Sequence, residues 1–116
     1  MDDANPWPLF DLAIKTPRLE LRYATDELLL GLVDVADDVI SPGTMPFDGD
    51  ASFYDLSSAG RRRWLAGQWG ARARTSPAWW VLVFAVVVEG RPVGTQEITG
   101  ANFSALRTVD TFSWLT

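Results

Sequence analysis

The sequence predicts an α+β fold in which one strand, two helices and a three-stranded antiparallel meander follow one another. The strongest signal is the run from Trp79 to Val88, which holds five valines and no polar residue. Such a run is typical of a strand buried on both faces. Upstream, apolar residues recur at helical spacing, and downstream, turn residues separate two further strand-like segments. The 116 residues fit one domain.

The chain begins with a segment that predicts an extended arm. Residues 1–17 are interrupted by three prolines, which a stable helix does not tolerate, and the apolar residues between them are expected to dock on the domain. Beyond the arm, Leu19, Leu21 and Tyr23 alternate with charged residues. This period of two predicts a half-buried first strand.

Two helices are expected next. Thr25 is a suitable N-cap for the first, whose apolar residues share one face (Leu28, Leu32, Val35, Val39) and which ends at Ser41-Pro42-Gly43. The second runs from Ser57 or Ser58 to about Arg74. Its glycines make it intrinsically weak, so tertiary packing of its tryptophans is expected to hold it.

The meander follows the second helix. Glu89-Gly90-Arg91-Pro92 is a turn after the valine-rich strand, and Val93 to Thr99 returns as the next strand. Gly100-Ala101-Asn102 is a further break, and Arg107 to Leu115 is expected to form the last strand.

Composition excludes several classes of site. Without cysteine the chain has no disulfide, thiolate metal ligand or cysteine nucleophile, and without histidine it lacks the Ser-His-Asp triad and most zinc sites; no metal site is expected. The net charge of −5 argues against general nucleic-acid binding. The acidic start is unlike a signal peptide, and the longest apolar run is shorter than the ~20 residues of a membrane span. We therefore expect a cytoplasmic protein that binds neither membrane nor nucleic acid.

Four segments stand out in order along the chain: Thr16–Arg22 in the first strand, Pro42–Phe47 in the loop between the helices, Glu89–Gln96 around the turn, and Arg107–Thr111 with Ser113-Trp114-Leu115 in the last strand. In this order they resemble the GNAT superfamily of N-acetyltransferases, in particular the branch that acts on amino-terminal amines of ribosomal proteins. The resemblance implies a partial GNAT domain over residues 18–116, after the arm of residues 1–17, with an incomplete sheet. In the family, a glycine-rich turn then binds the pyrophosphate of acetyl-CoA at a helix start. The 116 residues hold no such turn, so we expect a truncated domain.

The resemblance also implies where the chemistry lies. The backbone of Phe112, Ser113, Trp114 and Leu115 corresponds to the strand along which acetyl-CoA binds, although Phe112 stands where the subgroup has glycine. Glu97 is the candidate general base, because burial among neutral residues raises the pKa of a carboxyl, and Asp110 is a second candidate. Four residues of the loop at 41–56 are candidates for an acceptor-amine pocket (Met45, Phe47, Phe53, Tyr54). Each has a plainer alternative, namely a solvent-facing carboxylate, an ordinary edge strand or a cover for the core.

Two functions follow as expectations. The first is an N-acetyltransferase that moves acetyl from acetyl-CoA to a small-molecule or protein amino-terminal amine, inactive as these 116 residues alone. The second is a non-enzymatic interaction module whose exposed last strand pairs with a complementary chain or a second copy of itself.

Overall fold

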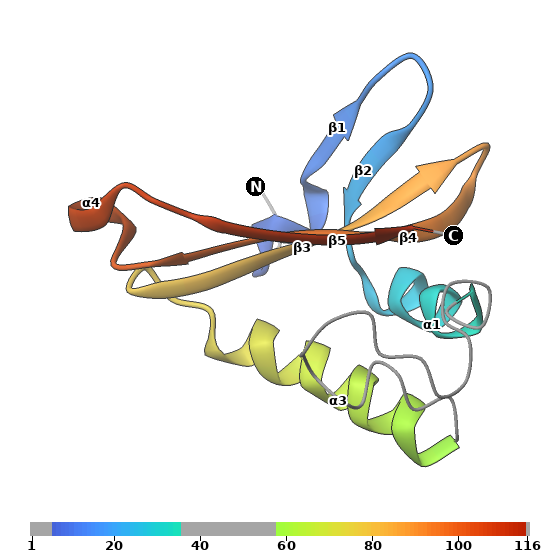
Figure 1. Cartoon of the computed structure of the whole chain (residues 1–116), viewed down its shortest axis with the longest axis horizontal. Coiled ribbons are helices and arrows are strands. Elements are labelled where there is room, and N and C mark those ends of the chain that lie inside the picture. Colours follow the sequence, from blue (N-terminus) through green and yellow to red (C-terminus); the bar gives the residue numbers. More distant parts are fainter. Residues whose placement is uncertain (1–5, 36–57, 116) are drawn as a thin grey trace.

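The computed structural model describes residues 6–35 and 58–115, which form an α+β domain built on one antiparallel sheet (Figure 1). In chain order the elements are a 3₁₀ turn η1 (Pro8–Asp11), β1 (Ala13–Lys15), β2 (Glu20–Tyr23), α1 (Asp26–Val35), α3 (Ser58–Arg74), β3 (Trp79–Val88), β4 (Arg91–Ala101), α4 (Phe103–Leu106) and β5 (Asp110–Leu115). The α+β class predicted from the sequence is confirmed.

The five strands lie side by side in their order along the chain, each antiparallel to its neighbours. Both longer helices, α1 and α3, lie against the same face of this sheet (Figure 1). Paired residues in adjacent strands point to the same face, so the rows Val83–Glu97–Phe112 and Ala85–Thr95–Trp114 share one side. Because Ala85 and Trp114 belong to the core cluster, this side is the helix-facing side.

The core lies between that side and the two helices. Leu29 and Leu32 of α1 pack with Ala85, Val87 and Trp114 of the sheet, and Trp64 and Leu65 of α3 pack against the cluster. The expected tryptophan packing of the second helix is therefore confirmed for Trp64, while Trp69 stays exposed. The central part of β3, from Phe84 to Val87, is buried on both faces, whereas most of the residues toward its ends are half-buried.

The helix boundaries agree with the sequence where the structure describes them. The side-chain oxygen of Thr25 accepts the amide of Leu28 at 3.4 Å, and its backbone oxygen accepts the amide of Leu29 at 2.9 Å, as an N-cap requires. The second helix begins at Ser58 and ends at Arg74. The expected continuation of the first helix to Val39 and its end at Ser41-Pro42-Gly43 lie outside the described residues.

Two predictions about connections need correction. The arm is not extended throughout, because residues 8–11 form the 3₁₀ turn and Ala13–Lys15 form a strand that pairs with β2. The expected break at Gly100-Ala101-Asn102 comes later, since β4 runs through Ala101 and a one-turn helix, α4, precedes β5. Asn102 and Arg107 adopt positive φ at the two ends of α4. Residue propensities do not predict this conformation for an arginine.

Candidate functional site

The two candidate carboxylates lie on the same, helix-facing side of the sheet. Glu97 in β4 pairs with Val83 on one side and with Phe112 on the other. Asp110 lies two residues before Phe112 in β5 and pairs with Thr99. Glu97 and Asp110 are therefore diagonal neighbours, a relation that places residues about 7–8 Å apart. The sequence named both residues, and the sheet register brings them together.

The two carboxylates differ in their surroundings. Glu97 is half-buried, and burial raises the pKa of its carboxyl above the ordinary value of 4.5. Among the described residues no cation or hydrogen-bond donor offsets this loss of solvation. Asp110 is exposed at the start of the edge strand. The sequence-based expectation that burial perturbs Glu97 is confirmed, while Asp110 occupies the solvent-facing position that was its plainer alternative.

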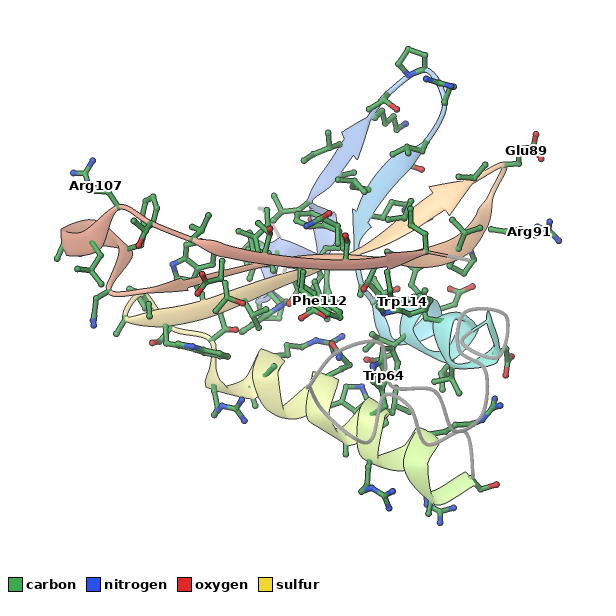
Figure 2. All side chains as sticks on the ribbon, viewed as in Figure 1. Trp64, Glu89, Arg91, Arg107, Phe112 and Trp114 are labelled. Atoms are coloured by element: carbon green, nitrogen blue, oxygen red, sulfur yellow. The ribbon has the colours of Figure 1, made fainter. Side chains whose placement is uncertain are left out.

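β5 forms one edge of the described sheet, and its backbone at residues 112–115 is the candidate for binding the acyl donor. Phe112 and Trp114 project to the helix-facing side, as Figure 2 shows, and Trp114 is buried in the core. Ser113 and Leu115 alternate with them, so they point to the opposite face. Phe112 remains 37% exposed and Leu115 56% exposed. The backbone of residues 112–115 therefore lies at an accessible edge, with one exposed apolar side chain on each side of it.

The four candidate acceptor-pocket residues of the loop at 41–56 (Met45, Phe47, Phe53, Tyr54) lie outside the described residues. Their role therefore stays a prediction.

A cluster around Arg72 was missed by reasoning from the sequence. The guanidinium of Arg72 donates to Asp26 Oδ1 at 2.8 Å and to the backbone oxygen of Ala24 at 2.9 Å, and it lies over the ring of Phe10. Trp69 Nε1 donates to the same carboxylate oxygen at 3.1 Å. Arg72 holds the pKa of Asp26 below its ordinary value. The cluster thus links the arm, the start of α1 and α3, elements that are far apart in the sequence.

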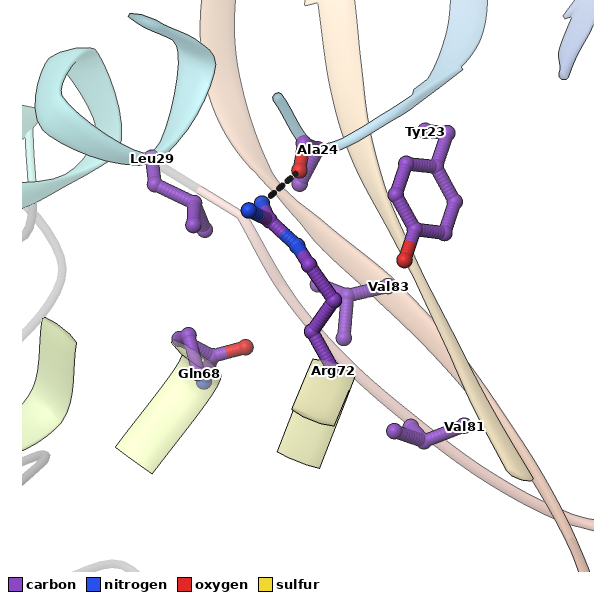
Figure 3. A pocket seen from close by; sticks show the side chains of 7 residues that line it. All are labelled: Tyr23, Ala24, Leu29, Gln68, Arg72, Val81 and Val83. Atoms are coloured by element: carbon purple, nitrogen blue, oxygen red, sulfur yellow. Dashed lines mark hydrogen bonds between the residues drawn. The ribbon is translucent and has the colours of Figure 1, made fainter. Parts of the chain in front are cut away.

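Beside this cluster lies a recess between α3 and the sheet, lined by seven residues (Tyr23, Ala24, Leu29, Gln68, Arg72, Val81, Val83; Figure 3). Its cavity volume is about 10 Å³, the space that one water molecule needs. Two N–H groups of Arg72 donate to Asp26 and Ala24, which fixes the guanidinium on these neighbours. The recess is therefore a packing feature rather than a binding site.

Thr95 is a buried polar residue in the core. It is 1% exposed on the helix-facing side of β4, between Ala85 and Trp114, and its hydroxyl oxygen makes no hydrogen bond with any of the described residues. Burying a hydroxyl without a partner costs free energy. Thr95 therefore lowers the stability of the core in this structure.

Three further findings concern metal ions, membranes and known families. Within residues 6–35 and 58–115, no cluster of three or more acidic, cysteine or histidine side chains is placed to bind a metal ion. In the same part of the chain, no helix has the length and apolar character needed to cross a membrane. No protein-family model matches the chain. Among the described residues, the half-buried carboxylate of Glu97 beside the edge strand β5 is the candidate functional site.

Proposed function

We propose that these residues form part of a GNAT-type N-acetyltransferase site. They bind the acceptor amine, and they supply the strand along which the acyl donor lies. One observation carries the proposal, namely the half-buried Glu97 carboxylate that no cation among the described residues neutralises. A carboxylate in that state is complemented by an ammonium group, which restores the lost electrostatic stabilisation. The resemblance of four segments to the family supports the same assignment.

Glu97 suits the role of a general base. A base works best when its pKa lies near the working pH, and burial moves the pKa of Glu97 upward in that direction. In this assignment the carboxylate receives a proton from the substrate ammonium, directly or through a water molecule, and leaves the amine free to attack. Asp110, at the diagonal position, adds negative charge that attracts a cation to the same side.

The pantetheine arm and the pyrophosphate of an acyl donor fit these residues differently. The accessible edge of β5 offers backbone groups of residues 112–115 to the extended pantetheine arm, as the resemblance implies. The thioester of the donor supplies the acyl group. These 116 residues contain no glycine-rich turn after β5 for the pyrophosphate, and the exposed side chain of Phe112 stands on the helix-facing side where the resemblance expects glycine. In this proposal these residues bind the acceptor amine and the pantetheine arm, but they do not bind the pyrophosphate of the acyl donor.

Titration with n-propylammonium, followed by amide chemical shifts, tests the assignment of Glu97. We expect the largest shifts at Glu97 and Phe112, and a dissociation constant that rises about tenfold or more in Glu97→Gln, because a hydrogen bond to a charged group is worth about 1.5–3 kcal/mol. Glu20→Gln is the matched control, since it removes the same charge two strands away. Shifts that are absent, or that are equal in Glu97→Gln and Glu20→Gln, would remove the basis of the proposal.

A further inference from the structure

Two apolar side chains flank the carboxylate of Glu97 along its row of the sheet. Val83 pairs with Glu97 across the β3–β4 ladder and Phe112 pairs with it across the β4–β5 ladder, so all three side chains lie on the helix-facing side. Residues directly opposite each other in an antiparallel ladder have Cβ atoms about 4.5–5.5 Å apart. A group bound at the carboxylate is therefore within reach of both Val83 and the ring of Phe112.

The position of Phe112 beside Glu97 is fixed from the other face of the sheet. Gln96 Nε2 donates to the backbone oxygen of Glu97 at 3.3 Å and to the backbone oxygen of Phe112 at 3.4 Å. One side chain thus bridges the backbones of the two paired residues. The ladder and this bridge together hold the carboxylate and the ring as neighbours.

The chemistry of this row favours one class of cation. A metal ion needs several oxygen or nitrogen ligands, and in the part of the chain that the structure describes no three acidic or histidine side chains are grouped to supply them. An organic ammonium group suits the row better, because it donates to the carboxylate, is attracted to an aromatic ring, and carries an alkyl chain that apolar side chains can cover. Phe112 is 37% exposed, so its ring is accessible to such a ligand.

We propose that Phe112 determines the specificity of the acceptor site. The acceptor is a primary alkylamine whose ammonium group binds the carboxylate of Glu97 and whose first carbon atoms contact the ring of Phe112. This assignment rests on the proposed function, since it names the acceptor of that same site. The residue that stands where the resembling family has glycine then has a role in binding. The contact involves side chains on the helix-facing side, and not the backbone edge of β5.

Titrations of the 116-residue chain with n-propylammonium and with the ammonium ion, followed by amide chemical shifts, test this assignment. We expect n-propylammonium to bind at least about fourfold more tightly, the change that one buried methylene group gives. Phe112→Leu should weaken n-propylammonium binding about two- to fivefold, the range of a cation–π contact at an exposed site, and Phe112→Tyr should bind as the unchanged chain does. Phe103→Leu is the matched control, because it removes a ring that is 38% exposed and packs against Trp80.

A measurement on the unchanged chain is independent of how these variants fold. In the complex, a nuclear Overhauser effect should connect the ring protons of Phe112 with the methylene protons of bound n-propylammonium. An absent Overhauser effect would overturn the role of Phe112.

The two proposals fail in different ways. If n-propylammonium causes no shifts, or binds Glu97→Gln as tightly as the unchanged chain, both the acceptor site and its specificity are wrong. The acceptor site stands but the role of Phe112 is wrong if n-propylammonium binds at Glu97 with the same affinity in Phe112→Leu, if Phe103→Leu weakens binding as much, or if the ammonium ion binds equally well.

Discussion

Glu97 lies directly across the β4–β5 ladder from Phe112, so that a half-buried carboxylate and an exposed ring share the helix-facing side at the edge of the described sheet. No cation among the described residues neutralises the carboxylate of Glu97, and the neighbouring Phe112 is accessible to solvent. Most half-buried carboxylates are paired with a cation, because an uncompensated charge destabilises the folded state. This relationship leads to the first prediction.

Replacing Glu97 with glutamine should stabilise the protein in a pH-dependent way. The folded state raises the pKa of Glu97, so it binds this proton more tightly than the unfolded state does. The stability that the protonated group contributes is present below the unfolded pKa, near 4.5, and is lost as the pH rises through the folded pKa. Glu97→Gln should therefore unfold at a higher temperature than the unchanged chain at pH 7–8, and the difference should close below about pH 4.5.

Thermal unfolding between pH 4 and pH 8 measures this difference. Asp110→Asn serves as the control, since an exposed substitution on the neighbouring strand should change the free energy of unfolding by no more than about 0.5 kcal/mol. A Glu97→Gln variant that is less stable than the unchanged chain at pH 8 contradicts the assignment of an uncompensated charge.

Arg72→Met should destabilise the fold by about 1–3 kcal/mol, because it removes two hydrogen bonds of a side chain that is only 19% exposed and leaves the backbone oxygen of Ala24 without this donor. Arg74→Met is the matched control on the same helix. Its exposed guanidinium stacks on Trp79, a contact worth about 0.5–1 kcal/mol. Urea denaturation of both variants makes the comparison. Equal losses show that the Arg72 cluster does not join the arm to the helices.

Gly100→Ala should destabilise the protein by about 1–3 kcal/mol, because a Cβ atom at this position meets the ring of Trp80 across the β3–β4 ladder. Gly67→Ala is the opposite case. Gly67 lies on the exposed side of α3, and no described residue comes within 4 Å of its Cβ position, so the substitution should stabilise the protein by about 0.5–1 kcal/mol. Chemical denaturation distinguishes them by sign, and two changes of the same sign count against the packing of Trp80 over Gly100.

Thr95→Val should raise the free energy of unfolding by about 1 kcal/mol, because valine keeps the shape of threonine and removes a buried hydroxyl without a partner. Thr111→Val, on the exposed edge strand, should stay within about 0.5 kcal/mol of the unchanged chain. A loss of stability in Thr95→Val indicates that the hydroxyl has a hydrogen-bond partner in solution.

The strands and helices with clear periodicity were predictable from the sequence. The Trp79–Val88 run and the 58–74 helix are found at the expected residues, because apolar patterning and capping act locally. The strand Ala13–Lys15 was not predicted. It is only three residues long, too short to show an alternation of apolar and polar residues, and it forms because it pairs with β2 in a hairpin. The helix α4 was missed because the positive φ of Arg107 at its end has no local sequence signal, whereas Asn102 favours that conformation.

The candidate site was predicted in part. Glu97 was found because a lone carboxylate in an apolar strand indicates burial, and Asp110 was found on the same logic although it is exposed. The Arg72–Asp26 pair was not found, since the two residues are 46 positions apart and only the packing of α3 against α1 brings them together. Contacts between distant segments depend on tertiary structure, which a single sequence does not encode in any local pattern.

The measurement that tests the acyltransferase proposal most directly is a titration of the 116-residue chain with acetyl-CoA and, separately, with acetyl-pantetheine, followed through the backbone amides of β5. Both ligands should shift the amides of residues 112–115, with similar and weak affinity, because the chain offers the strand but no turn for the pyrophosphate. If neither ligand shifts those amides, the assignment of β5 as the strand for the acyl donor is wrong. If acetyl-CoA binds far more tightly than acetyl-pantetheine, these residues also bind the pyrophosphate, and the proposed division of the site is wrong.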